Sequence, residues 1–194
     1  MLLSPPEADN AVSESVCGLG SLLREEGFSV SVDQWSRVQQ CALRPLPWLH
    51  SQLLHLDSVG QGRVVLVLTQ EARDRAEEWS QRHQGATTQG NLEDKGRPSQ
   101  MSSPYSDLFT ASLCCIWADK QVGRAGQRFM LVNFETLASQ QTLLARSDRV
   151  LPELLQGLTL VHLPSQMQTL LSELSVGQRM KQHDDNMRKT RGRV

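Results

Sequence analysis

The sequence offers little for covalent cross-linking. Only four cysteines occur among the 194 residues, and no two of them form a C-x-x-C pair. Adjacent Cys114 and Cys115 would point to different sides of a helix, so a disulfide framework is not expected. Two of the four lie inside apolar helical patterns, which is typical of buried, reduced thiols in a reducing compartment such as the cytosol.

Long apolar runs are also missing. No segment reaches the roughly 18 apolar residues that a membrane-spanning helix requires, and the N-terminus lacks the basic-then-apolar pattern of a signal peptide. We therefore expect the chain as given to be soluble and cytosolic. Met1-Leu2-Leu3 is followed at once by Ser4-Pro5-Pro6, as at the end of a strand whose beginning is missing. This predicts a truncated first strand and an excised domain or a truncated product.

Neither sign of charge is in excess. The chain has 20 Lys and Arg against 21 Asp and Glu, a formal net charge of −1, which predicts no bulk attraction to nucleic acid or lipid. The length and a hydrophobic content of 39% fit one globular domain. Residues 177–194 carry six Lys or Arg against two Asp without apolar periodicity, so a basic disordered tail is expected there.

Strand patterns recur along the chain. The run "RVVLVLT" at 63–69 is continuously apolar, which is typical of a strand covered on both faces in a parallel sheet. Residues 28–32 alternate apolar and polar side chains and end at Asp33, the pattern of a half-buried strand. Further strands are expected at the N-terminus, over 128–134 and over 158–163.

Helical patterns separate these strands. Apolar residues recur at helical spacing over 9–26, and Gly27 should end that helix in a left-handed conformation. Pro45 and Pro47 can begin the next helix, which Trp48 should anchor on the sheet. Helices are also expected over 105–118, within 135–156 and after Pro164. The alternation predicts a three-layer α/β fold with a five-stranded, mainly parallel sheet of flavodoxin-like topology.

The segment from Glu71 to His83 is the most highly charged helical pattern. Only Ala72, Ala76 and Trp79 form its apolar stripe, so the predicted helix buries a narrow face and stands out from the body of the domain. Residues 84–104 then contain Gly, Ser, Thr, Pro and mixed charge with almost no large apolar side chain. A long mobile loop is expected there.

Motifs for catalysis or ligand binding are missing where an α/β sheet would present them. The segment "CGLG" lies inside the first helix and "GQG" at 60–62 precedes a strand, so neither can present backbone amides to a phosphate. His50 and His55 are five residues apart rather than four, and no G-x-S-x-G occurs. We therefore expect no catalytic residues, no cofactor and no metal, although a site can also assemble from distant positions.

Four motifs follow one another in the order found in a family of signalling domains. They are "SVDQWSR", "PLPWLHSQ", "GRVVLVLTQEARDRAEEW" and "YSDLFTASL". On these motifs the chain resembles the SEFIR domain, a relative of Toll/interleukin-1 receptor domains, over residues 1–176. Receptors of the family usually carry a tyrosine before the serine that follows the first strand, whereas this chain has Leu3 before Ser4.

The resemblance implies a flavodoxin-like, Toll/interleukin-1-receptor-like fold and the cytoplasmic part of an interleukin-17 receptor chain. Such domains dock onto the SEFIR domain of an adaptor, and pairing with other receptor SEFIR domains is a related expectation. The charged helix is then a docking surface whose charges set partner choice. Any membrane attachment would come from a segment absent from this chain. The predicted partner-binding residues are Trp35, Arg37, Glu71, Arg73, Asp74, Arg75, Glu77, Glu78 and Arg82.

Alternatives remain at this stage. A charged helix is commonly no more than a solvated face. Certain Toll/interleukin-1 receptor domains cleave NAD with a glutamate that follows a helix tryptophan by three positions, and Arg82 stands at the corresponding place after Trp79. A third reading is a soluble decoy that sequesters the adaptor.

Overall fold

The computed structural model describes residues 1–6, 10–33, 45–59, 62–84, 107–135 and 151–175. Within these residues four parallel strands form one sheet in the order β1-β2-β3-β4. The strands are β1 Leu2–Leu3, β2 Val64–Val67, β3 Phe129–Phe134 and β4 Thr159–Leu163. All four residues of β2 are buried, as its continuous apolar run predicts. The predicted loop beyond Gln84 and the predicted tail at 177–194 lie outside the described residues.

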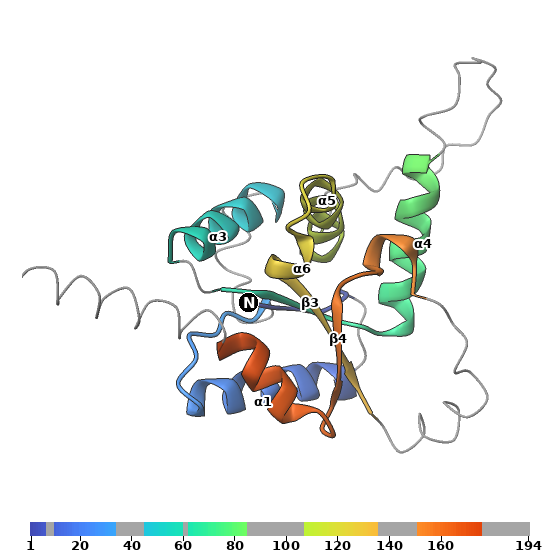
Figure 1. Ribbon diagram of the computed structural model, residues 1–194. Helices are drawn as coiled ribbons and strands as arrows, with labels where there is room; N and C mark the ends of the chain where they lie inside the picture. The colour runs from blue at the N-terminus through green and yellow to red at the C-terminus, as the bar shows by residue number, and fades with distance from the viewer. Residues whose placement is uncertain (7–9, 34–44, 60–61, 85–106, 136–150, 176–194) are drawn as a thin grey trace, which may run out of the picture.

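Helices cover both faces of the sheet, as Figure 1 shows. Helices α3, α4 and α5 lie on one side, and α1 lies on the other side together with the helical residues 167–175. The helices are α1 Asn10–Glu25, α3 Pro45–Val59, α4 Gln70–Gln84, α5 Leu108–Gln121 and α6 Ala125–Arg128, with the 3-10 helix η3 Glu153–Leu155. This arrangement confirms the three-layer α/β prediction.

The fifth predicted strand is not confirmed. Of residues 28–32, Val32 forms one isolated parallel bridge with Leu2, and the Leu2 amide donates to the Ser31 carbonyl at 2.8 Å. Pairing stops there because β1 itself is two residues long. The segment still lies beside β1, on the opposite edge from β4, which is where a flavodoxin-like order places its second strand.

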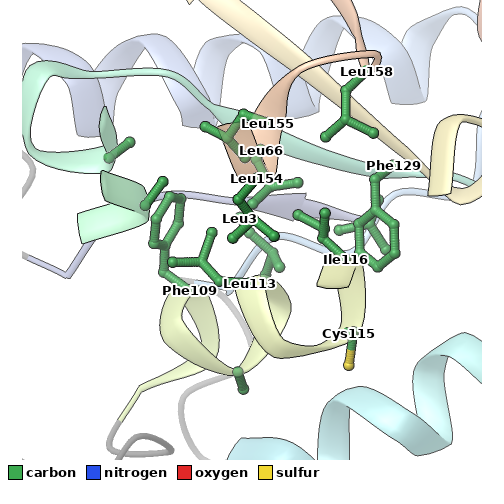
Figure 2. Close-up of a cluster of buried hydrophobic side chains, with 14 of the residues drawn as sticks. Leu3, Leu66, Phe109, Leu113, Cys115, Ile116, Phe129, Leu154, Leu155 and Leu158 are labelled. Carbon is green, nitrogen blue, oxygen red and sulfur yellow. The ribbon is translucent and has the colours of Figure 1, made fainter. Parts of the chain in front are cut away.

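Two apolar clusters lie on opposite faces of the sheet. The α5-side cluster joins α3, α4, α5 and η3 and includes Leu66, Phe109 and Leu155, which Figure 2 shows together. The α1-side cluster includes Val65 and Val67. Side chains along β2 therefore alternate between the two clusters, as the pleat of a strand requires. Each helical layer is attached to the sheet by its own core.

Several local predictions are confirmed at the ends of elements. Gly27 has φ of 87° and follows α1, in the left-handed conformation expected of a helix-ending glycine. Trp48 is 3% exposed within the α5-side cluster, so it anchors α3 on the sheet. Asp33 accepts a hydrogen bond from the amide of Ser4 at 3.1 Å and joins the end of β1 to the segment beside it.

The described cysteines are free thiols. Cys115 of α5 is buried, whereas Cys17 and Cys114 are partly exposed. Burial raises the pKa of the Cys115 thiol to about 12, and the neighbouring Cys114 acts in the same direction. Cys115 is therefore a protonated core residue at neutral pH, as the sequence predicts for buried thiols. Cys41 lies outside the described residues.

Candidate docking surface

Helix α4 begins directly after strand β2, where Thr69 caps it. The Thr69 hydroxyl accepts a hydrogen bond from the amide of Ala72 at 3.1 Å, and its carbonyl accepts one from the amide of Arg73 at 3.2 Å. Glu71 in the first turn complements the helix dipole. The remaining residues are mostly Ala, Glu, Gln and Arg, which are strong helix formers. The sequence thus starts a well-formed helix at the carboxyl end of β2.

A narrow apolar stripe attaches α4 to the domain, as predicted. Ala72 and Ala76 are fully buried and Trp79 is 6% exposed. The indole of Trp79 packs on that of Trp117 of α5, with ring centroids 6.1 Å apart and the planes tilted by 55°. Trp117 itself is 44% exposed. In Figure 1 α4 lies at the outer side of its layer, with its C-terminal end pointing away from the sheet.

Arg75 connects α4 to the start of α5. Its Nε bonds to Glu71 Oε1 at 2.8 Å, and one terminal nitrogen bonds to Asp107 Oδ2 at 3.0 Å. Asp107 is the N-cap of α5 and accepts a hydrogen bond from the amide of Thr110 at 2.8 Å. These three charged side chains are each about a quarter exposed or less. Two of the predicted docking residues, Arg75 and Glu71, thereby help to position the helix.

The exposed charged side chains of α4 lie on its solvent side. Glu78 and Arg82 form an ion pair in which both side chains are about 60% exposed. Asp74 accepts a hydrogen bond from the side-chain amide of Gln70 at 2.7 Å, and Glu77 has a longer one, 3.5 Å, from that of Gln81. The outward surface is thus a row of carboxylates, amides and one guanidinium on a single rigid element.

The structure brings seven of the nine predicted docking residues together on α4. Four of them are exposed and three are partly buried. The exposed residues are Asp74, Glu77, Glu78 and Arg82, and the partly buried residues are Glu71, Arg73 and Arg75. Trp35 and Arg37 lie outside the described residues. Sequence reasoning missed Asp107, whose place just before an apolar helical run is a recognisable cap signal, and Trp117, which no signal in the sequence marks as exposed.

Other kinds of site find no support in the part of the chain that the structure describes. No cluster of three or more His, Cys, Asp or Glu side chains within these residues could hold a metal ion. No helix within the described ranges is long and apolar enough to cross a membrane. Arg82, the position that would be glutamate in an NAD-cleaving relative, is exposed and paired with Glu78.

A parallel sheet with helices on both faces and a charged helix after strand β2 is the architecture of the flavodoxin-like α/β class, to which Toll/interleukin-1-receptor-like domains belong. The family model described as "SEFIR domain" matches residues 2–174. The chain therefore belongs to the SEFIR domain family, and the expected signalling interaction module is confirmed.

A curated relative of the chain is a receptor. The chain is 30% identical over 168 residues to human "Interleukin-17 receptor C", an alignment that covers 86% of this chain. It spans only 18% of the length of that relative. The comparison thus concerns the SEFIR portion of a much longer receptor.

Proposed function

We propose that this SEFIR domain recruits a SEFIR-domain adaptor by homotypic docking, on the cytoplasmic side of the membrane, through the solvent side of α4. The observation that carries the proposal is the division of α4 into two sides. Its buried stripe and the Arg75–Asp107 pair fix the helix, while Asp74, Glu77 and Glu78 face solvent. A helix held rigidly by one side can bind a partner with the other without reorganising the domain.

The charged character of this side suits selective recognition. Charges placed across an interface contribute more to partner choice and association rate than to raw affinity. The exposed Trp117 lies next to α4, and an aromatic side chain of this kind is a common anchor within a polar interface. We include Trp35 and Arg37 as further contacts, on the basis of the family resemblance. The same mode would allow pairing with other receptor SEFIR domains.

A charge-neutral double substitution tests this function. Replacing Glu78 and Arg82 together by alanine removes one carboxylate and one guanidinium, so the net charge of the domain is unchanged. Binding of the purified adaptor SEFIR domain is expected to weaken severalfold, because the substitutions delete two exposed charged side chains of the proposed surface. Thermal unfolding should be nearly unchanged, because both side chains are largely exposed.

A matched pair on the opposite layer provides the control. Arg24 and Glu25 are exposed neighbours at the end of α1, on the other side of the sheet. Their double alanine variant should bind the adaptor as the wild-type domain does. Equal loss of binding in both variants, or wild-type binding by the α4 variant, would refute docking through α4.

A further inference from the structure

We propose that the partner surface which meets α4 is basic, carrying Lys or Arg side chains opposite Asp74 and Glu77. This inference rests on the proposed docking function and names the chemistry of the partner. In the sequence, α4 is a mixture of four acidic residues and three arginines. Folding does not expose these residues equally, and the charge offered to a partner differs from the charge in the sequence.

Burial covers a larger share of the arginines of α4 than of its acidic residues. Arg73 and Arg75 are partly buried, and so is Glu71. Over residues 70–82 of α4, for which burial is described, the exposed charged residues are Asp74, Glu77, Glu78 and Arg82. These are three carboxylates against one guanidinium, an excess of two negative charges. The solvent side of α4 is thus acidic although the whole chain is nearly neutral.

Ion pairs strengthen the same asymmetry. The charge of Arg75 is shared between Glu71 and Asp107, and the charge of Arg82 is paired with Glu78. Asp74 and Glu77 instead accept hydrogen bonds from the neutral amides of Gln70 and Gln81. Neither carboxylate forms an ion pair within the described residues. These two side chains therefore carry the charge on α4 that an incoming cation can neutralise.

The spacing of these residues determines the form of the partner. Gln70, Asp74, Glu77 and Gln81 recur at intervals of four, three and four, which places them in one row along the helix. The row lies opposite the buried positions Ala72, Ala76 and Trp79. Two carboxylates one turn apart fit two cations about 5–6 Å apart, the separation of neighbouring side chains on a helix surface. We infer that the occupant is the SEFIR domain of the adaptor, presenting two such cations.

A charge reversal tests the inference. In the variant Asp74→Lys/Glu77→Lys, the Kd for the purified adaptor SEFIR domain should rise at least about tenfold at roughly 50 mM salt. The Kd of the neutral variant Asp74→Asn/Glu77→Gln should lie between that of the reversal variant and that of the wild-type domain. Raising the salt concentration to about 300 mM should bring the Kd values of the three proteins closer together, because screening weakens exposed charge pairs.

The control has the same change in net charge at another place. Glu14 and Glu25 are exposed on α1, across the sheet from α4. The variant Glu14→Lys/Glu25→Lys should leave the affinity within about twofold of the wild-type value. A parallel thermal melt of each variant establishes that it is folded before its affinity is compared.

The outcomes separate this inference from the function on which it rests. If the wild-type domain fails to bind the adaptor SEFIR domain at either salt concentration, the proposed function fails and the inference falls with it. If the wild-type domain binds and the reversal variant binds equally well or more tightly, docking stands and a basic partner surface is refuted. If sedimentation shows self-association that the reversal abolishes, the occupant is a second copy of this chain, which refutes the adaptor as the occupant of the α4 surface.

Discussion

At the level of single residues, Arg75 and Arg82 show how the fold gives one residue type two roles. Both are arginines on α4 and both pair with a glutamate four positions earlier. Arg75 also reaches Asp107, which caps α5, so it joins two helices. Arg82 has no such tertiary ion pair within the described residues, and its side chain is largely exposed. Exposed pairs of the second kind contribute little to stability.

Alanine at these two positions should therefore have different effects. We expect Arg75→Ala to lower the free energy of unfolding by about 1–2 kcal/mol, because Asp107 loses a partly buried, charged hydrogen bond. Arg82→Ala should change it by less than about 0.5 kcal/mol. Denaturant unfolding of the two variants beside the wild-type domain measures both values. Equal effects would contradict the positioning role given to Arg75.

The sequence could not distinguish these two arginines. The local patterns Glu71–Arg75 and Glu78–Arg82 have the same spacing and the same residue types. The difference arises from Asp107, which lies 32 positions after Arg75. Helical periodicity describes the sides of one helix, whereas a contact between two helices depends on how they pack. The residues of the candidate surface could thus be selected from the sequence, but their division into exposed and positioning residues could not.

At the level of elements, strand β4 shows how the end of an open sheet edge is covered. In the described sheet β4 has a neighbour on one side only. The amide of His162 donates to the side-chain oxygen of Gln166 at 2.8 Å, and the His162 carbonyl accepts a hydrogen bond from the backbone amide of Gln166 at 2.7 Å. Gln166, three positions after the strand, thereby satisfies both backbone groups of His162, which could otherwise pair with another strand.

Removing the side chain of Gln166 should leave the backbone amide of His162 without this acceptor. In Gln166→Ala the amide of His162 loses its acceptor, at a cost of about 1 kcal/mol. Hydrogen exchange of that amide should accelerate by about fivefold, since this is the factor that 1 kcal/mol represents if exchange occurs by local opening. Gln168→Ala, an exposed glutamine two positions later, is the control and should leave this rate unchanged. Unaltered exchange in the first variant would argue against the edge closure.

Helices and strands could be predicted where burial requires apolar residues at a regular spacing. β2 could be predicted because burial on both faces requires an unbroken apolar run. The alternation over residues 28–32 also predicts a strand, yet these residues make one bridge because their neighbour β1 has two residues. An alternating pattern reports burial on one face and says nothing about how long the partner strand is.

At the level of the whole molecule, the fold is of a type that hosts both enzymes and interaction modules, so NAD cleavage has to be tested by experiment. Arg82 replaces the carboxylate that an NAD-cleaving relative would use, and its side chain is exposed beside Glu78. We expect the purified domain to release no nicotinamide from NAD above a buffer control. Arg82→Glu should behave in the same way, because it restores one carboxylate without a surrounding site. Nicotinamide release by the wild-type domain would overturn this prediction.

The charge of the proposed docking surface is also a property of the whole fold. The sequence predicts a helix of mixed sign, and the residue types are as expected. Its acidic surface results from the partial burial of Arg73 and Arg75, while Asp74 and Glu77 stay exposed. Formal charge can be counted from a sequence, but the charge that a partner meets depends on which side chains other elements cover.

The attachment of α4 by Ala72, Ala76 and Trp79 has a consequence for how such domains diversify. These three side chains are buried, and the exposed positions between them take no part in either core cluster. Substitutions at those exposed positions leave the folding of the sheet nearly unaffected. With docking through α4 as proposed, related SEFIR domains can acquire new binding preferences by altering one side of a single helix, while the residues that form the core stay the same.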